Sequence, residues 1–242
     1  MNAGNWSVYT TQFSNSPQYS YYNPLIPASI YDAEVRLLEL IEEEGGFDGV
    51  MGYSMGAAFA AQVMIHHSRC SDGAEPLFRF AVFINGGTPL KAFEVAKEEI
   101  VEGAAASEEL ARELQATFLR PSNLRARKGD NGEEAEAAVA ARKRQIEAAS
   151  TGMLADGRSF LTNGKLGVTR YESRLDGTLI DVPTLHVSCP SEVNPNLGKN
   201  LLELCDPALV KEHHHPFGHD FPRGQVEMKK IAEAIADLAA SA

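Results

Sequence analysis

Apolar residues gather into short runs through the middle of the chain, in the order strand, helix, strand. Residues 47–53 are short and apolar, as a buried strand would be, and residues 55–70 follow as an alanine-rich run without a helix breaker after Gly56. Residues 78–85 are almost wholly apolar and end at two glycines, so they predict a second strand. Because strands that are joined through a helix pair in parallel, this order predicts an α/β fold with a mostly parallel sheet.

The same pattern continues towards both ends of the chain. Residues 29–44 predict a helix that stops at Gly45, and Ser29 with Asp32 resembles an N-terminal capping box. Downstream, the pattern predicts a strand, a helix, a strand and a final helix, at residues 181–188, 197–205, 209–214 and 225–240. Helices that alternate with parallel strands cover both faces of the sheet.

Two segments depart from this alternation. Residues 91–150 are rich in Ala, Glu, Lys and Arg with helical periodicity, and we interpret them as a helical insertion within one domain of residues 1–242. We expect the insertion to form a lid over the active site, although a solvated helical flap would show the same pattern. Residues 1–28 are polar, and within them only residues 6–13 alternate well enough to be a strand candidate.

The sequence Gly-Tyr-Ser-Met-Gly at residues 52–56 joins the first predicted strand to the helix that follows it. A serine at such a strand–helix turn is held in strained backbone geometry, and the flanking glycines remove the Cβ atoms that would clash. The helix also directs backbone N–H groups towards an anion beside the serine. We therefore predict Ser54 as a nucleophile and the backbone N–H of Met55 as an oxyanion donor. The alternative is a structural turn of small residues.

A serine needs a positioned base to act as a nucleophile. His219 lies in the loop between the last predicted strand and the final helix, where folds with this nucleophile turn carry their base, and we predict it in that role. The alternative is a surface histidine without a role. The consecutive histidines His213, His214 and His215 would end the strand with neighbours on opposite faces, and we interpret them as structural. His213 and His215 could share a face and bind a metal, which leaves a metal-dependent hydrolase as a further hypothesis.

The acid that orients the base is expected in the loop after the strand at residues 181–188. Glu192 is the carboxylate of that loop, so we predict a Ser-His-acid triad of Ser54, His219 and Glu192. Asp206 is the alternative acid, although a helix separates it from this strand. Asp220 is adjacent to His219 and would not face the Nδ1 atom of that ring. A solvated surface charge is the other interpretation of Glu192.

Composition limits the partners and the location of the protein. The 22 Lys and Arg residues stand against 33 Asp and Glu residues, a net charge of −11, so a nucleic-acid partner is not expected. The longest uncharged apolar run, residues 49–65, is broken by glycines and falls short of the roughly 20 residues that cross a membrane. Three cysteines in no paired motif, and a first basic residue as late as Arg36, predict a soluble, cytoplasmic protein. No metal or organic cofactor is expected.

Three segments together resemble the fungal FSH-type serine hydrolases, a family of α/β-hydrolases that includes enzymes releasing polyketides from their synthases. The segments are residues 47–58, 183–186 and 218–223. The resemblance covers most of the chain and implies an α/β-hydrolase fold, with Ser54 as nucleophile and His219 as base. It also implies a carrier-protein-bound polyketide as a substrate. The family usually carries Asp where Glu192 stands.

The front of the sequence departs from that family. Its members carry a strand, a His-Gly oxyanion loop, a helix and a second strand before the segment that matches residues 19–24. This sequence has no histidine before His66, so we expect the first strands to be lacking and the start to be incomplete. Alternatively, residues 6–13 or a partner replace the lacking strand. Without a neighbour, the strand at residues 47–53 would leave an apolar edge unpaired.

The predicted function is therefore that of a serine esterase or thioesterase acting on a short-to-medium acyl ester or thioester. The alternative is a weak or inactive hydrolase-fold binding protein that has lost its oxyanion segment. A fluorophosphonate probe that labels the serine would separate the two.

Overall fold

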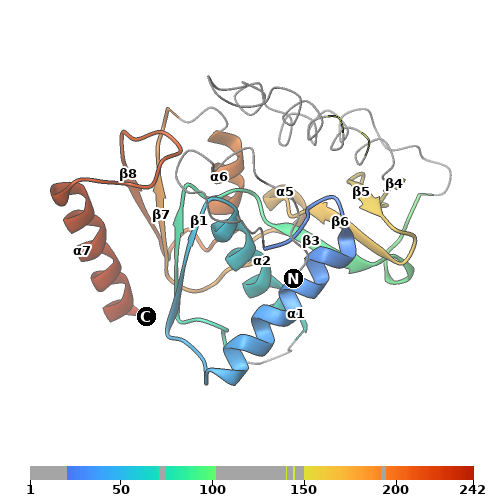
Figure 1. Ribbon diagram of the computed structural model, residues 1–242, viewed down its shortest axis with the longest axis horizontal. Helices are drawn as coiled ribbons and strands as arrows, with labels where there is room; N and C mark the ends of the chain where they lie inside the picture. The colour runs from blue at the N-terminus through green and yellow to red at the C-terminus, as the bar shows by residue number, and fades with distance from the viewer. Residues whose placement is uncertain (1–20, 71–74, 102–139, 141–143, 145–149, 192–194) are drawn as a thin grey trace. The chain divides into compact units, whose positions relative to one another are not determined.

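The computed structural model describes residues 21–70, 75–101, 140, 144, 150–191 and 195–242 (Figure 1). The chain divides into two compact units, which are described separately. The unit that holds the parallel sheet is made of Glu34–Lys91 and Arg170–Ala242. The other unit takes its described residues from Met1–Ala33 and Ala92–Thr169.

The described sheet of the first unit has the strand order β1-β2-β7-β8, and every neighbouring pair is parallel. Its strands are β1 (Gly49–Tyr53), β2 (Phe80–Ile84), β7 (Thr184–Ser188) and β8 (Val210–His214). Each lies within a segment that the sequence predicts as a strand, so the parallel α/β arrangement is confirmed. Because the strands are parallel, the segments that follow them all leave from one edge of the sheet.

Helices cover both faces of this sheet (Figure 1). They are α2 (Met55–Cys70), α6 (Pro195–Glu203) and α7 (Gln225–Ser241), and the short α5 (Ser173–Asp176) contacts α6. Val82 of β2 belongs to the core cluster that contains Ile231 of α7. Phe83, the next residue along the strand, belongs to the cluster that contains Ala57 of α2. Successive residues of a strand point to opposite faces, so β2 is buried between α7 and α2.

Among the described strands, β1 stands at one end of the sheet, with β2 as its neighbour. Met51, in the middle of β1, is 60% exposed, whereas Val82, which pairs with it, is buried. The strand candidate at residues 6–13 lies outside the described residues.

The helix predicted at residues 29–44 is α1 (Pro27–Glu43). Proline suits the first position of a helix because its missing N–H has no acceptor to bind there. The Ser29 hydroxyl accepts a hydrogen bond from the backbone N–H of Asn23 at 3.0 Å. The capping box predicted for Ser29 and Asp32 is therefore wrong, since Ser29 lies inside the first turn and its hydroxyl closes the turn that precedes the helix.

A buried carboxylate joins the later part of α1 to α2. Glu34 is 1% exposed, its Oε2 lies 2.6 Å from Nδ1 of His66, and its Oε1 accepts a hydrogen bond from the Gln62 amide. The hydrogen bond with Glu34 raises the pKa of His66 above its ordinary value, and the burial of the ring opposes this shift only in part. The two helices are thus held together by a charge-assisted contact in the interior.

The other unit contains an antiparallel sheet that the sequence analysis did not predict. Its strand order is β3-β6-β5-β4, with β5 antiparallel to both β4 and β6. The strands are β3 (Leu90–Glu94), β4 (Ser150–Met153), β5 (Ser159–Thr162) and β6 (Leu166–Arg170), and the 3-10 helix η1 (Val95–Lys97) follows β3. Phe93, Leu154 and Phe160 form its core cluster. The helical character expected from residue 91 onwards is therefore wrong at the start of the segment, where the chain is extended.

Most of the helical insertion expected at residues 91–150 lies outside the described residues. Two described residues in its later part, Ala140 and Arg144, are helical. The lid within a single domain stays a prediction. In the part of the chain that the structure describes, no helix combines the length and the apolar character needed to cross a bilayer.

Candidate active site

Ser54 occupies the turn between β1 and α2. Its backbone φ is 53°, a value that residues other than glycine rarely adopt. Its backbone N–H donates to the carbonyl of Ile84 at 2.8 Å, which ties the turn to the end of β2. A Cβ at position 52 would lie 2.5 Å from Cα of Ala57, so Gly52 is required for the helix to approach the strand. The surrounding structure thus holds Ser54 in a strained conformation at the edge where the strands end.

His219 lies beside Ser54, although 165 residues separate the two in the sequence. Its Nε2 atom is 2.7 Å from Oγ of Ser54, within the range of a direct proton transfer. His219 is in the segment between β8 and α7, and parallel strands place that segment at the same edge as the turn after β1. The structure therefore brings together the two side chains that the sequence analysis selected as nucleophile and base.

Met55 is the first residue of α2, directly after Ser54. The N-terminal N–H groups of a helix carry the positive end of its dipole and favour a negative charge nearby. The position of the Met55 N–H therefore fits an oxyanion that forms on a carbonyl attacked by Ser54. Its role as donor stays a prediction.

Glu192, the predicted acid, lies outside the described residues. The loop that leads to it leaves β7 at the edge that carries Ser54, and in it Sγ of Cys189 lies 3.2 Å from Oγ of Ser191. The choice of Glu192 stays a prediction.

The two other carboxylates considered for this role are engaged elsewhere. Asp206 precedes β8 and therefore lies at the edge where the parallel strands begin, opposite to Ser54; its Oδ1 accepts the N–H of Ala208 at 2.9 Å. Asp220 forms an ion pair with Arg223 at 3.0 Å on the surface. The alternative acid at position 206 is therefore excluded by the topology of the sheet.

The three consecutive histidines at the end of β8 contact different partners. Nε2 of His213 lies 2.7 Å from a carboxylate oxygen of Glu227, and Nδ1 of His214 lies 3.3 Å from Oγ of Ser188. His215 is buried and its Nε2 lies 3.1 Å from Oδ1 of Asn85. Within the described residues, no group of three or more His, Cys, Asp or Glu side chains is arranged to hold a metal ion.

His186 of the segment at residues 183–186 is a buried residue of β7. Burial lowers its pKa to about 4, so the ring is neutral, and it packs edge-on against Phe83 with ring centroids 5.3 Å apart. Its Nε2 lies 3.5 Å from Sγ of Cys205, and burial raises the pKa of that thiol to about 12. Both groups are therefore held in their neutral forms in the core.

Sequence reasoning missed the residues that hold the His219 segment in place. The Tyr53 hydroxyl donates to the backbone carbonyl of His219, and the Tyr53 ring packs edge-on against Phe221 with centroids 5.6 Å apart. The Asn85 amide donates to the carbonyl of Asp220 at 3.0 Å. No local pattern marks these contacts, because each joins residues more than a hundred positions apart.

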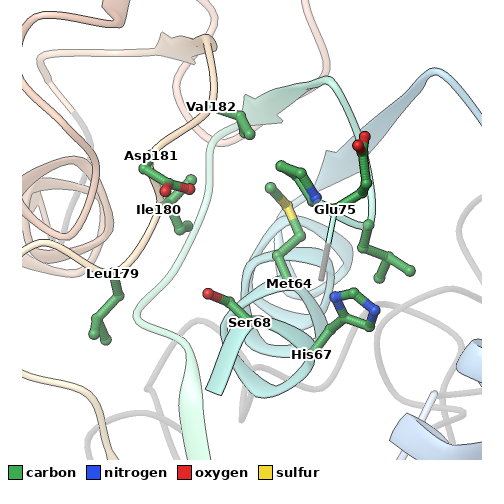
Figure 2. Close-up of a pocket in the computed structure, with 10 residues that line it drawn as sticks. Met64, His67, Ser68, Glu75, Leu179, Ile180, Asp181 and Val182 are labelled. Atoms are coloured by element: carbon green, nitrogen blue, oxygen red, sulfur yellow. The ribbon is translucent and has the colours of Figure 1, made fainter. Parts of the chain in front are cut away.

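A pocket of about 70 Å³ lies at the other end of α2, and Figure 2 shows the side chains that line it. Met64 and Ile180 contribute apolar walls, and the carboxylates of Glu75 and Asp181 lie at its rim. Met64 is nine residues beyond Met55, so about 13 Å of helix separates the pocket from the turn at Ser54. None of the predicted site residues lines this pocket.

A family model described as "Serine hydrolase (FSH1)" matches residues 28–231, a span that contains both Ser54 and His219. The chain belongs to this family. It is therefore a serine hydrolase, and the resemblance seen in its sequence motifs is confirmed. Its parallel sheet with helices on both faces is the α/β-hydrolase type of fold.

Relatives of this FSH1 serine hydrolase are fungal hydrolases and esterases. It is 26% identical to Hydrolase FUB4 of Fusarium oxysporum f. sp. lycopersici, over 93% of this chain and 79% of that protein. It is also 26% identical to Esterase FPY3 of Fusarium mangiferae, over 92% of this chain and 71% of that protein. Hydrolase phiM of Talaromyces stipitatus is 42% identical over a shorter stretch, 26% of each chain.

Among solved structures, a putative lipase of Acinetobacter baumannii is similar to this chain with a TM-score of 0.47 and 12% identity, over 94% of this chain and 71% of that one. A structure of RedJ with a PEG molecule bound in its active site gives a TM-score of 0.44 and 15% identity, over 89% of this chain and 73% of that one.

Proposed function

We propose that this FSH1 serine hydrolase cleaves a carboxylic ester or thioester with a triad of Ser54, His219 and Glu192. The contact of 2.7 Å between Oγ of Ser54 and Nε2 of His219 is the observation that supports the proposal most directly. The strained turn at Ser54 gives independent support, because strain of this kind is retained where function requires it.

In the first half of the reaction, Oγ of Ser54 attacks the substrate carbonyl carbon while Nε2 of His219 takes the hydroxyl proton. The carbonyl oxygen becomes negatively charged, and the N–H of Met55 donates to it. The tetrahedral intermediate then collapses, the bond to the alcohol or thiol breaks, and the imidazolium returns its proton to that leaving group. The product of this half is an acyl-enzyme.

In the second half, His219 takes a proton from water, and the resulting hydroxide attacks the acyl carbon. Collapse of the second intermediate returns the proton to Oγ of Ser54 and releases the carboxylic acid. Glu192 accepts a hydrogen bond from Nδ1 of His219 throughout, which keeps Nε2 free of a proton before each attack and stabilises the imidazolium afterwards. These steps use only side chains and backbone N–H groups of the chain.

For the substrate, we propose a short-to-medium acyl chain, which includes a polyketide that is bound to a carrier protein. The resemblance to fungal enzymes that release polyketides supports this class, and hydrolysis of a thioester is the chemistry that such a release requires. The cytoplasmic location stays a prediction, which fractionation of cells that express the full-length protein would test.

Hydrolysis of p-nitrophenyl esters and of acyl thioesters of increasing chain length tests the proposal. We expect turnover by the wild type and a loss of at least about a thousandfold in Ser54→Ala. Ser68→Ala changes another serine near the far end of α2 and is expected to leave turnover unchanged. Equal activity in Ser54→Ala and the wild type would refute the proposal. A folded wild type without any turnover would favour the non-catalytic binding protein.

A further inference from the structure

The segment that carries His219 is held through two consecutive backbone carbonyls. The carbonyl of His219 accepts the Tyr53 hydroxyl, and the carbonyl of Asp220 accepts the Asn85 amide at 3.0 Å. Tyr53 ends β1 and Asn85 directly follows β2, so the two donors come from neighbouring strands. The two peptide groups that directly follow the Cα of His219 are therefore fixed to the ends of β1 and β2.

Asn85 belongs to a hydrogen-bond network that also contains His215. Backbone groups at the two ends of the network determine which atom donates and which accepts in each bond. The carbonyl of Asp220 can only accept, so the Asn85 NH₂ group must face it, and Oδ1 of Asn85 must then face Nε2 of His215 at 3.1 Å. At the other end, the backbone N–H of Phe217 can only donate, and it points to Nδ1 of His215 at 3.2 Å. His215 is therefore neutral, with its proton on Nε2.

The Asn85–His215 network is buried, and the backbone of both residues is hydrogen-bonded to a third strand, β7. Asn85 and His215 are each 2% exposed. The backbone N–H of Asn85 donates to the carbonyl of Val187 at 2.8 Å, and that of His215 donates to the next carbonyl, that of Ser188, at 3.0 Å. Both carbonyls belong to the end of β7, so the side chains of Asn85 and His215 project from a rigid support.

The end of β2 is also the support of the nucleophile. The N–H of Ser54 is bound to the carbonyl of Ile84, and the next residue, Asn85, holds the carbonyl of Asp220. Ser54 and the segment of His219 are thus anchored to two consecutive residues, the last residue of β2 and the one that follows it. A displacement of about 1 Å in such a contact costs roughly a hundredfold in rate, so this common support bears directly on turnover.

We propose that Asn85 and His215 are positioning residues, which fix the catalytic imidazole relative to Ser54 through the carbonyl of Asp220. This inference rests on the proposed function. The choice of asparagine follows from two requirements: φ at this position is 45°, which asparagine tolerates better than most residues, and both a donor and an acceptor are needed on one short side chain.

Asn85→Asp tests the proposal, because it keeps the shape and the tolerance of positive φ but replaces the donor with an oxygen that faces the Asp220 carbonyl. We expect kcat for a p-nitrophenyl ester to fall about 10- to 100-fold, with KM within about twofold of the wild type, since the imidazole moves and the acyl site does not. A kcat within twofold of the wild type would overturn the inference.

Asn200→Asp is the matched control. Nδ2 of Asn200 donates to the carbonyl of Tyr171 at 2.7 Å and its Oδ1 accepts the N–H of Ser173 at 3.3 Å, so the same substitution breaks the same kind of bridge away from Ser54. We expect it to change stability but not kcat per folded molecule. If Asn200→Asp lowered kcat as much as Asn85→Asp, the effect would be general destabilisation and the inference would be overturned.

Two variants of His215 keep the test decisive if Asn85→Asp does not fold. The amide nitrogen of glutamine reaches the place of Nε2 and can still donate to Asn85, whereas leucine cannot. We expect His215→Gln to retain a kcat about tenfold higher than His215→Leu, and equal values in the two folded variants would overturn the inference. Ser54→Ala is measured in the same assay as a control for the proposed function. If the proposed function fails, the wild type shows no turnover that depends on Ser54. If only the positioning inference fails, the wild type shows such turnover and the two His215 variants have equal kcat.

Discussion

Two histidines of the parallel-sheet unit make short contacts of nearly the same length, but in opposite surroundings. Nε2 of His219 lies 2.7 Å from the hydroxyl of Ser54 on an exposed loop, and Nδ1 of His66 lies 2.6 Å from the carboxylate of Glu34 in the interior. The partner of His219 is a hydroxyl group, whereas the partner of His66 is an acid that is 1% exposed.

The difference in surroundings leads us to expect a catalytic role for the first contact and a structural role for the second. A hydroxyl beside an imidazole gains reactivity when its proton moves to the ring, and the backbone at Ser54 is strained, with a φ of 53°. A carboxylate beside an imidazole in the interior stabilises the imidazolium, so its proton stays in place. The contact at His219 is therefore expected to govern turnover, and that at His66 to govern stability.

The largest expected effect concerns turnover. His219→Ala removes the base and should lower kcat/KM for a p-nitrophenyl ester by about a thousandfold or more, because the Ser54 hydroxyl is a poor nucleophile alone. His66→Gln should leave kcat/KM within about threefold of the wild type, since the ring takes no part in the reaction. Steady-state kinetics on folded protein measure both, and equal losses would contradict the division of roles.

The second expected effect concerns Glu192, the carboxylate proposed to orient His219. Glu192→Gln should lower kcat by about 10- to 1,000-fold, because the amide cannot stabilise the imidazolium. Asp206→Asn should cost less than threefold, since Asp206 lies at the opposite edge of the sheet and caps a local turn. The reverse ranking in steady-state assays would move the acid to position 206 and contradict the topology.

A third prediction concerns the interior contact. Glu34→Gln keeps the size of the side chain but replaces the charged acceptor of His66, and should lower the free energy of unfolding by about 1–3 kcal/mol. Urea denaturation measures the change, and turnover per folded molecule should stay within about twofold of the wild type. Loss of turnover without loss of stability would show that the two contacts are not separate in function.

The smallest expected effect is a dependence of stability on pH. The folded state holds the pKa of His66 above its ordinary value of 6.5, because the hydrogen bond with Glu34 favours the imidazolium. The resulting stabilisation is complete below pH 6.5 and is lost as the pH rises through the raised pKa. Thermal unfolding between pH 6 and pH 9 should therefore show a steeper loss of stability in the wild type than in His66→Gln. Parallel curves would contradict the assignment.

Much of the parallel sheet could be predicted from the sequence, because three of its described strands, β1, β2 and β7, are mainly apolar runs bounded by glycine or proline. Segments 47–53 and 78–85 are short apolar runs, so their strand positions follow from the local pattern, although only the second is largely buried. The antiparallel strands of the other unit could not be predicted in this way. Leu90–Glu94 contains Lys, Ala and Glu, which favour helices, and pairing with β6 together with burial of Phe93 determines its extended state.

The residues of the candidate site also fall into those that a local pattern identifies and those that only long-range contacts reveal. Ser54 and His219 could be selected because a local motif and a position after the last strand identify them. Asn85 and His215 could not, since the contact between them joins residues 130 positions apart and neither belongs to a motif. The clue present in the sequence was an asparagine directly after a buried strand, a residue type suited to positive φ, but its partner is visible only in the fold.

The central claim is that the Ser54 hydroxyl is made nucleophilic by His219. A fluorophosphonate probe followed by mass spectrometry of the digested protein tests it most directly, because the probe forms a stable bond only with an activated serine. We predict a single adduct on the peptide that contains Ser54, formed at least a hundredfold more slowly in His219→Ala. An adduct on another serine, or an unchanged labelling rate in His219→Ala, would contradict the claim.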